Sequence, residues 1–285
     1  MGTVRIVTDS TADIPEDIRK RLNIEVVPLK VHFGTYTYID SVTLGAKQFY
    51  DKLAVSTVFS TTSQPSPIDF LDTYKKLQGA EPSTPVVSIH ISSALSGTYQ
   101  SAMLARSMMD VALDITIIDS KSASFGLGIR VVKAAEAAQE GRSKEEILKL
   151  LNEMDEKFSL YFLVNTLQHL HKGGRIGKAA AIFGSLLNIK PILSIDVSGE
   201  ITSVDKVRGQ RKAMTRIVEM LAETWGPEDP MEIGISHADA LPVAEELSAL
   251  ISQHFNVKKT TFTWVGPVVG THSGPGTVAI FVIKA

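Results

Sequence analysis

Short apolar runs alternate with amphipathic stretches along the first 160 residues. Residues 4–8, 85–91 and 115–118 are rich in branched apolar side chains, which is typical of buried strands. A helical pattern follows each run, and the clearest one, over residues 124–139, has Ala and Val on its inner face. Strands that alternate with helices in this way predict βαβ units and a mostly parallel sheet.

Residues 24–62 interrupt this alternation. Residues 24–33 are extended and rich in β-branched side chains, and after a Gly-Thr turn residues 36–39 resemble the second strand of a hairpin. A short helix is expected over residues 46–54. We therefore predict a small insertion that contains β structure.

The pattern becomes less regular near residue 160, and we place a domain boundary at residues 158–165. This gives an N-terminal domain of residues 1–160 and a C-terminal α/β or α+β domain of residues 161–285. Residues 179–188 are apolar nearly all round, which predicts a buried helix. Other strands are expected at residues 160–164, 191–196, 200–205, 232–236, 260–265 and 277–283, and other helices at residues 166–171, at residues 208–223 and from residue 241.

Composition limits the classes of function. The chain has 285 residues, a formal net charge of −2, 44% apolar residues and no Cys. The apolar share suits a protein with a buried core, and the charge gives no indication of binding to nucleic acid or to a membrane surface. No Cys is present to form a disulfide, a thiolate metal site or a nucleophile. We expect a cytoplasmic protein without membrane insertion, because no apolar run is long enough for a signal or a membrane span.

Hydroxyl and carboxyl side chains follow three of the predicted strands, in residues 9–13, 92–98 and 119–122. Because the carboxyl ends of parallel strands share one edge of a sheet, these side chains should form the polar rim of a crevice. Ser93, Ser96 and the amides of Gly97 and Thr98 would then hold a carboxylate or a phosphate at the start of a helix. The alternative is an ordinary Ser/Thr cap.

Common catalytic and cofactor motifs are missing from the sequence. It contains no G-x-S-x-G elbow, no H-E-x-x-H zinc motif and no G-x-G-x-x-G after a strand, and residues 172–178 lack the spacing of a P-loop. His272 lies in a predicted glycine-rich loop, where the backbone can approach a ligand closely; alternatively, it braces the loop. Such a donor-rich rim favours holding an anion over transforming it.

Six short motifs follow one another along the chain. They are Thr8-Asp9-Ser10-Thr11-Ala12-Asp13, Thr62-Ser63-Gln64-Pro65-Ser66, Ser92-Ser93-x-Leu95-Ser96-Gly97-Thr98, Lys172-Gly173-Gly174-Arg175-Ile176, Val207-Arg208-Gly209 and Gly270-Thr271-His272-x-Gly274-Pro275-Gly276. Together they resemble the motifs of the DegV family of bacterial fatty-acid-binding proteins, and the resemblance covers the whole chain.

This resemblance implies an α/β fold in which a Rossmann-like N-terminal domain carries the small β insertion and is followed by a second α/β domain. A long-chain fatty acid such as palmitate would lie in a tunnel between the domains. Some family members present the fatty acid to a separate fatty acid kinase, which forms an acyl phosphate for phospholipid synthesis. The protein itself would be a carrier that has the fatty acid as its ligand and no catalytic residue, metal or other cofactor.

The resemblance also implies the roles of single residues. Thr62 and Ser93 would hydrogen-bond the carboxylate, His272 would complete the head-group site, and Arg175 would lie near the tunnel mouth. The candidate ligand-binding residues are Thr62, Ser63, Ser92, Ser93, Ser96, Gly97, Arg175, Thr271 and His272. The candidate tunnel wall, which alternatively is plain core, comprises Phe183, Leu186, Leu187 and Ile192.

Two other classes of protein stay open on the sequence. One is an enzyme, such as a phosphotransferase or an esterase, that uses Ser93 or Ser96 together with His272. The other is a regulatory protein that senses a lipid and binds a further partner.

Overall fold

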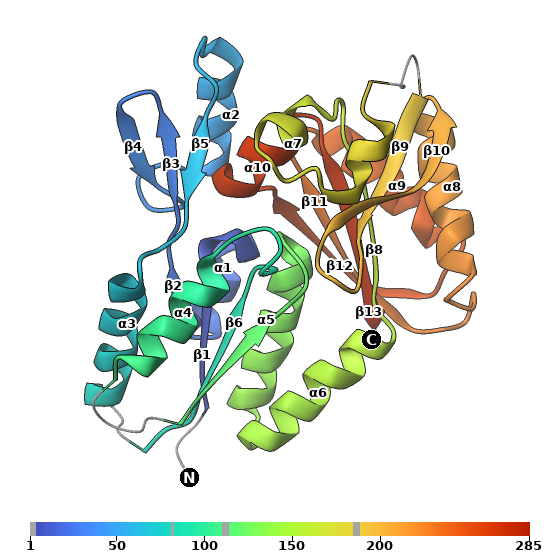
Figure 1. Ribbon diagram of the computed structural model, residues 1–285. Helices are drawn as coiled ribbons and strands as arrows, with labels where there is room; N and C mark the ends of the chain where they lie inside the picture. The colour runs from blue at the N-terminus through green and yellow to red at the C-terminus, as the bar shows by residue number, and fades with distance from the viewer. Residues whose placement is uncertain (1–3, 81–82, 110–113, 185–188) are drawn as a thin grey trace.

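A four-stranded parallel sheet forms the centre of the N-terminal half. The computed structural model describes residues 4–80, 83–109, 114–184 and 189–285 (Figure 1). The sheet has the order β2-β1-β6-β7. Its strands are β1 (Arg5–Asp9), β2 (Glu25–Val27), β6 (Val86–His90) and β7 (Ile115–Asp119). The helices of this half are α1 (Glu16–Arg21), α3 (Pro67–Ala80), α4 (Thr98–Ser107), α5 (Phe125–Gln139) and α6 (Lys144–Glu156), with the 3-10 turn η1 (Ser10–Ala12).

A small antiparallel sheet lies at one end of the parallel sheet. It has the order β4-β3-β5, from β3 (Lys30–Phe33), β4 (Tyr36–Ile39) and β5 (Thr61–Ser63), and it is accompanied by α2 (Ala46–Val55) (Figure 1). These elements fall within the predicted insertion of residues 24–62, except that β5 ends one residue later, at Ser63. β2 also falls in that range but pairs with β1, so it extends the parallel sheet.

A six-stranded mixed sheet of order β10-β9-β8-β13-β11-β12 forms the C-terminal half. Its strands are β8 (Ser159–Leu163), β9 (Ile189–Ile195), β10 (Ile201–Arg208), β11 (Met231–His237), β12 (Val257–Trp264) and β13 (Val278–Lys284). The helices are α7 (Gln168–Lys172), α8 (Gln210–Ala222), α9 (Leu241–Ser252) and α10 (Pro267–Ser273), with the 3-10 segment η2 (Gly177–Ile182). The predicted α/β fold class is confirmed, with one parallel, one small antiparallel and one mixed sheet.

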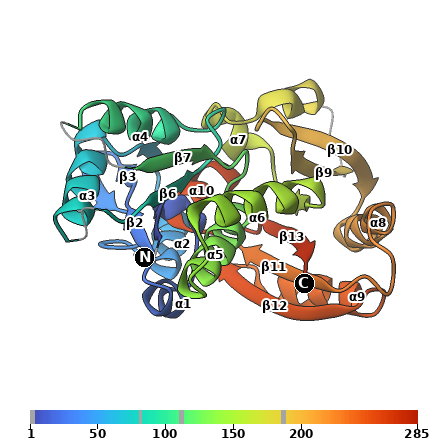
Figure 2. The same cartoon turned by 90° about the horizontal axis from the view of Figure 1, so that it is seen from below.

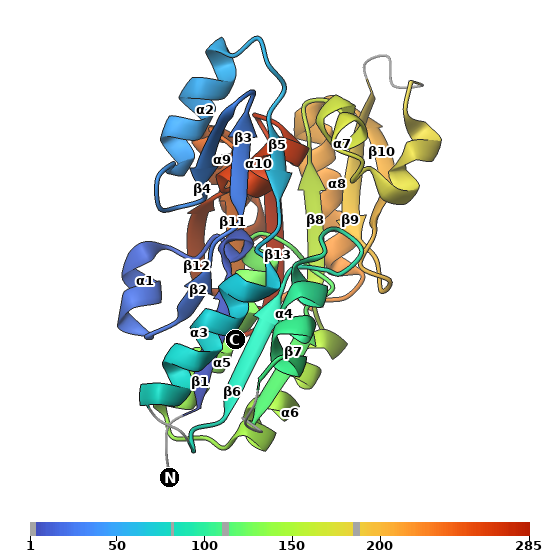
Figure 3. The ribbon, with the colours of Figure 1, turned by 60° about the vertical axis from the view of Figure 1, so that its left-hand side comes forward.

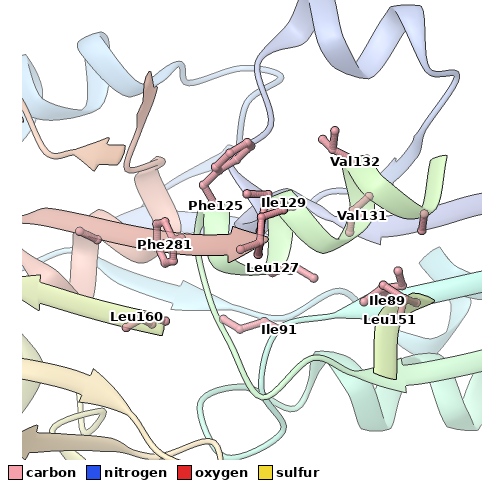
Figure 4. Close-up of a cluster of buried hydrophobic side chains, with 14 of the residues drawn as sticks. Ile89, Ile91, Phe125, Leu127, Ile129, Val131, Val132, Leu151, Leu160 and Phe281 are labelled. Atoms are coloured by element: carbon pink, nitrogen blue, oxygen red, sulfur yellow. The ribbon is translucent and has the colours of Figure 1, made fainter. Parts of the chain in front are cut away.

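The layers stack in the order helices, sheet, helices, sheet, helices (Figure 2). α3 and α4 cover one face of the parallel sheet, and α5 and α6 cover the other. α5 also packs against the mixed sheet, whose outer face is covered by α8 and α9. A single apolar cluster therefore contains residues of α5, β6, β8 and β13, as Figure 4 shows.

The alternation of side chains along β13 explains how one strand serves two cores. Val278, Ile280 and Val282 pack toward α8 and α9, whereas Ala279 and Phe281 pack toward α5. This is the period of two that an extended strand imposes. Because both faces of the strand are covered, the sequence is apolar without interruption.

Two predicted elements differ from the observed ones. The predicted buried helix over residues 179–188 is wrong in its first part, because η2 ends at Ile182 and Phe183 is 40% exposed; residues 185–188 lie outside the described ranges. The predicted glycine-rich loop around His272 is instead the helix α10, which begins with a Pro in its first turn. Among the described residues, no helix has both the length and the apolar character needed to cross a membrane.

The close approach of α5 to η1 yields the first testable prediction. A methyl group at Gly128 would lie 2.2 Å from the carbonyl oxygen of Ala12, a backbone atom. We expect Gly128→Ala to lower the free energy of unfolding by about 1–3 kcal/mol, as overpacking does, measured by urea denaturation. Gly79→Ala in α3, where nothing lies within 4 Å, is the control. It should be neutral or stabilising by up to about 1 kcal/mol, and the same result at Gly128 would contradict the prediction.

Candidate functional site

A cavity of about 390 Å³ lies between the parallel and the mixed sheet, next to the small sheet. This volume is within the usual range for small-molecule sites, about 300–1,000 Å³. Its apolar lining is Leu29, Ile91, Leu95, Ala123, Leu160, Phe162, Leu170, Ile195, Ile201, Val265, Val268, Val269, Ala279 and Phe281. Its polar lining is Thr62, Ser63, Gln64, Ser96, Ser124, Arg175, His272, Ser273 and Thr277. The cavity is thus chiefly apolar, with a limited set of polar groups.

The cavity has polar groups both where it opens to solvent and in its buried part, where Ser124, Ser273 and Thr277 lie. Gln64 and Arg175 are exposed to solvent, so the cavity opens where they lie, whereas Phe162 and Phe281 are buried. We call the part lined by Gln64 and Arg175 the mouth. A ligand with one polar end at the mouth and a long apolar part inside would contact mainly apolar side chains.

Thr62 and His272 meet beside the mouth, although they are 210 residues apart in the chain. The Oγ1 of Thr62 lies 2.8 Å from the Nε2 of His272. The Nδ1 of His272 is buried against Gly173 and has no hydrogen-bond partner. A buried N–H without an acceptor is rarer than a bare acceptor, so we assign the proton to Nε2, which donates to Thr62. The hydroxyl proton of Thr62 is then free for a ligand.

His272 is neutral at ordinary pH. Burial, together with the positive charge of the nearby Arg175, lowers the pKa of His272 to about 4. A neutral imidazole contributes one N–H donor and no charge. The pair Thr62–His272 is therefore a neutral donor system and not a cationic one.

The local fold explains why Thr62 faces the cavity. In β5, Thr62 pairs with Val31 of β3, and Thr61 just before it is exposed. Successive residues of a strand point to opposite sides, so the side chain of Thr62 points inward.

His272 is held by the anchoring of α10, which lies between the small sheet and the mixed sheet (Figure 3). The hydroxyl of Tyr50 in α2 donates to the carbonyl oxygen of Val265, 2.8 Å away. The backbone amide of Gly266, the residue before α10, bonds to the Asp13 carboxyl, which also accepts a 2.5 Å bond from Ser124. Burial raises the pKa of Asp13 well above its usual value.

Four of the nine candidate residues are not among those that line the cavity. The hydroxyl of Ser92 donates to the carbonyl oxygen of Gly199 at 2.8 Å. The hydroxyl of Ser93 donates to the Asp119 carboxylate at 2.5 Å. Thr271 is buried and its hydroxyl donates to Pro267. Gly97 has no side chain, and its Cα lies against the amide group of Gln64, which lines the mouth.

The structure brings the other five candidates, Thr62, Ser63, Ser96, Arg175 and His272, to the cavity. The hydroxyl of Ser63 bonds to His32 at 2.9 Å, and that of Ser96 bonds to Thr98 at 2.8 Å. The guanidinium of Arg175 donates to two carbonyl oxygens, those of Leu95 and Gly173.

The wall of the cavity is built from residues that the sequence did not single out. Phe183 stacks on His171 at the surface, Ile192 belongs to the outer core, and Leu186 and Leu187 lie outside the described residues. Phe183 and Ile192 do not line the cavity, and Ile192 is plain core, the alternative that the sequence left open. The alternation of β13, which directs Ala279 and Phe281 inward, is the signal that could have located part of the wall.

The described residues contain no candidate metal centre, and they do not pair Ser93 or Ser96 with His272. Within the described ranges, no three His, Cys, Asp or Glu side chains form a possible metal site. The hydroxyls of Ser93 and Ser96 bond to Asp119 and Thr98, and the one hydroxyl bonded to His272 is that of Thr62. What the arrangement can do chemically is to donate hydrogen bonds to an acceptor at the mouth.

The fold and the cavity define a class of α/β protein with a chiefly apolar cavity between two sheets and a neutral donor pair beside its mouth. The family model described as "Uncharacterised protein, DegV family" matches residues 3–285. This chain belongs to the DegV family.

Relatives and solved structures agree with this assignment. Protein DegV of Bacillus subtilis is 38% identical over 282 residues, which cover 97% of this chain and 98% of that protein. A DegV family protein from Thermus thermophilus, whose structure concerns fatty acid binding, superposes with a TM-score of 0.92 at 33% identity, over 99% of this chain and all of its own. The structure of DegV from Bacillus subtilis, described as a fatty acid binding protein, has a TM-score of 0.90 at 36% identity and covers both chains completely.

The low pKa of His272 gives a prediction for its ring. We expect the His272 ring signals in NMR spectra to stay unchanged from about pH 8 to pH 5.5 and to move near pH 4, because burial disfavours the charged ring. An unfolded His has a pKa of about 6.5, so protonation of the unfolded chain should lower the free energy of unfolding as the pH falls from about 6.5 to 4. His272→Gln should remove that part of the pH dependence. Titration of the ring near pH 6.5 would contradict the assignment of a neutral donor pair.

Proposed function

We propose that this protein binds a long-chain fatty acid in the cavity. The acyl chain would lie among the apolar side chains of the interior, and the carboxylate would lie near Thr62 and His272. One observation supports this most directly: the described cavity lining is chiefly apolar, and Thr62 and His272 form a neutral hydrogen-bonded pair beside its mouth. The fatty acid binding attributed to the related proteins from Thermus thermophilus and Bacillus subtilis supports the same choice.

The acyl chain should supply most of the affinity. Burial of about 14 methylenes, as in palmitate, at roughly 0.8 kcal/mol each is worth on the order of 11 kcal/mol. The loss of freedom of a flexible chain offsets part of this gain. A hydrogen bond to a charged carboxylate contributes only about 1.5–3 kcal/mol. The head-group residues should therefore orient the ligand more than they retain it.

The head-group site would use neutral donors. Thr62 would donate its free hydroxyl proton to the carboxylate while His272 holds its oxygen from behind. Ser96 would be a second donor, and Arg175 would add positive charge at the mouth. Ser93 would be a further donor after its hydroxyl leaves Asp119. The other candidates, Ser63, Ser92, Gly97 and Thr271, would shape the backbone around the head-group site.

A carboxylate at the mouth would be accessible to a partner. Gln64 and Arg175 are exposed beside it, and the buried acyl chain would stay in place while the head group reacts. We propose that a separate fatty acid kinase phosphorylates the carboxylate there, and that the acyl phosphate enters phospholipid synthesis. The protein alone, given ATP and palmitate, should form no acyl phosphate, whereas addition of the kinase of the same cell should form it.

Native mass spectrometry of the purified protein is the first test. The expected result is a stoichiometric mass increment that solvent extraction releases as a long-chain fatty acid. A protein that is empty and does not take up added palmitate or oleate would refute the proposal. A covalent acyl adduct on Ser93 or Ser96 would favour an esterase or a transferase instead.

Neighbouring residues of β5 provide a matched pair of variants. We expect Thr62→Val to weaken palmitate binding by about 2 kcal/mol, a factor of roughly 30, because it removes one hydrogen bond to a charged group. Thr62→Ser should restore most of the affinity. Thr61→Val, on the exposed side of the same strand, should bind like the unmodified protein. Equal affinities of all four proteins in a titration would exclude Thr62 from the site.

A further inference from the structure

The Ser93 hydroxyl is held by a neighbouring carboxylate. Asp119, at the carboxyl end of β7, accepts a 2.5 Å bond from the Oγ of Ser93 through its Oδ2. Its Oδ1 accepts from the backbone amides of Ser93, at 3.2 Å, and Lys121, at 3.0 Å. The ammonium of Lys121 lies 2.9 Å from Oδ2. Asp119 thus contacts four polar groups, and Ser93 and Lys121 supply two of them each.

These partners keep Asp119 ionised. Burial acts to raise the pKa of the Asp119 carboxyl, but the hydrogen bonds from Ser93 and Lys121 outweigh burial and hold its pKa below the usual value. The side chain of Asp119 is 11% exposed, so solvent competes weakly for these bonds.

A serine hydroxyl has a single proton. While that proton is bonded to Asp119, Ser93 can accept a hydrogen bond but cannot donate one to a second carboxylate. Residues close to Ser93 in the sequence nevertheless line the cavity, namely Ile91, Leu95 and Ser96. Ser93 is half-buried and does not line the cavity itself.

We infer that Asp119 is a positioning residue that competes with the ligand for the Ser93 hydroxyl, so that a carboxylate is bound through Ser93 only after this hydroxyl leaves Asp119. This inference rests on the proposed function. It follows that Asp119 reduces the affinity for a ligand with a carboxylate head group and has little effect on the affinity for a ligand with a neutral head group. When the carboxylate leaves, the Ser93 hydroxyl bonds to the ionised Asp119 again. This bond offsets part of the free energy that release of the carboxylate costs.

Replacement of Asp119 by Asn is a sharp probe of this competition. The amide oxygen of Asn can still accept from the two backbone amides, so the turns keep their hydrogen bonds. The amide nitrogen takes the place of Oδ2 and donates to the Oγ of Ser93, which frees the hydroxyl proton. Lys121 is 48% exposed and can move its ammonium into solvent.

The experiment measures binding of palmitate and of methyl palmitate to delipidated protein. We expect Asp119→Asn to raise the affinity for palmitate about 5–10-fold, which corresponds to the gain of one modest hydrogen bond. The affinity for methyl palmitate should stay within about twofold of that of the unmodified protein. Asp114→Asn is the charge-matched control, because Asp114 precedes the other end of β7 and its side chain is 55% exposed. It should change neither affinity.

The Ser93→Ala background separates the hydroxyl from simple charge repulsion. If Asp119 acts through Ser93, the gain on Asp119→Asn disappears when Ser93 is Ala. An equal gain in the Ser93→Ala background would overturn the inference, because charge alone would then explain the effect. The inference would also be overturned if Asp119→Asn left the ratio of palmitate affinity to methyl palmitate affinity unchanged. Thermal unfolding checks that each variant is folded.

A second readout does not depend on the folding of the Asn variant. The side-chain carboxyl signal of Asp119 in carbon-13 NMR spectra should titrate at a higher pH in Ser93→Ala, because one stabilising bond is lost. It should shift in the same direction when palmitate binds to the unmodified protein, but not when methyl palmitate binds. Binding of palmitate without this shift would overturn the inference alone, whereas failure to bind palmitate at all would overturn the proposed function and the inference with it.

Discussion

The packing of α5 against two sheets fixes the geometry of the whole molecule. Phe125 in its first turn lies over Gly234 of the mixed sheet, and Gly126 leaves space for the ring of Phe281. On its other side, α5 shares a core with β1 and β6 of the parallel sheet. One helix therefore sets the distance between the sheets. α5 begins at Phe125, and Ser124, the residue before it, lines the cavity, so the cavity lies beyond the N-terminal end of this helix.

Hydrogen bonds at the cavity mouth join segments that are distant in the chain. Thr62 comes from the small sheet, His272 from α10, and Ser96 from the turn before α4. Of the charged groups near them, Asp119 is paired with Lys121, whereas Arg175 donates to two carbonyl oxygens and keeps its positive charge. Neutral hydroxyl donors orient a carboxylate with bonds weak enough to let it be exchanged.

Much of the fold could be predicted from the sequence, because its strands and helices have clear periods. β6, α5 and the hairpin of β9 and β10 lie close to their predicted positions. α10 was missed, since Gly266, Gly270 and Gly274 are typical of a loop, and its helical form depends on bonds to Tyr50 and Asp13 from other elements. Residues 179–182 were assigned to a buried helix from composition alone, but only Ala179 is fully buried there.

The candidate site was predictable to the extent that motifs mark it. The Thr62 and His272 motifs were identified separately, but their contact spans 210 residues and no local pattern could show it. The same limit applies to Ser93: its motif indicates a hydroxyl at the rim, and only the tertiary structure reveals that Asp119, 26 residues later, receives the proton. Most wall residues are ordinary strand residues, and alternation alone does not distinguish a side chain facing a cavity from one facing a core.

The mouth and the core differ in how much a ligand must disturb to enter. Around α5 the apolar packing is continuous on both sides, so separation of the sheets there would expose a large apolar area. At the mouth, the two halves are joined by single hydrogen bonds, such as Ser92 to Gly199, Arg175 to Leu95 and Thr62 to His272. A neutral bond is worth about 1 kcal/mol net and the bond from the charged Arg175 about 1.5–3 kcal/mol, so the mouth is where the molecule opens at least cost. Thr62 and His272 thus lie where the head of the proposed ligand would be exposed, and the rigid part of the fold would surround its acyl chain.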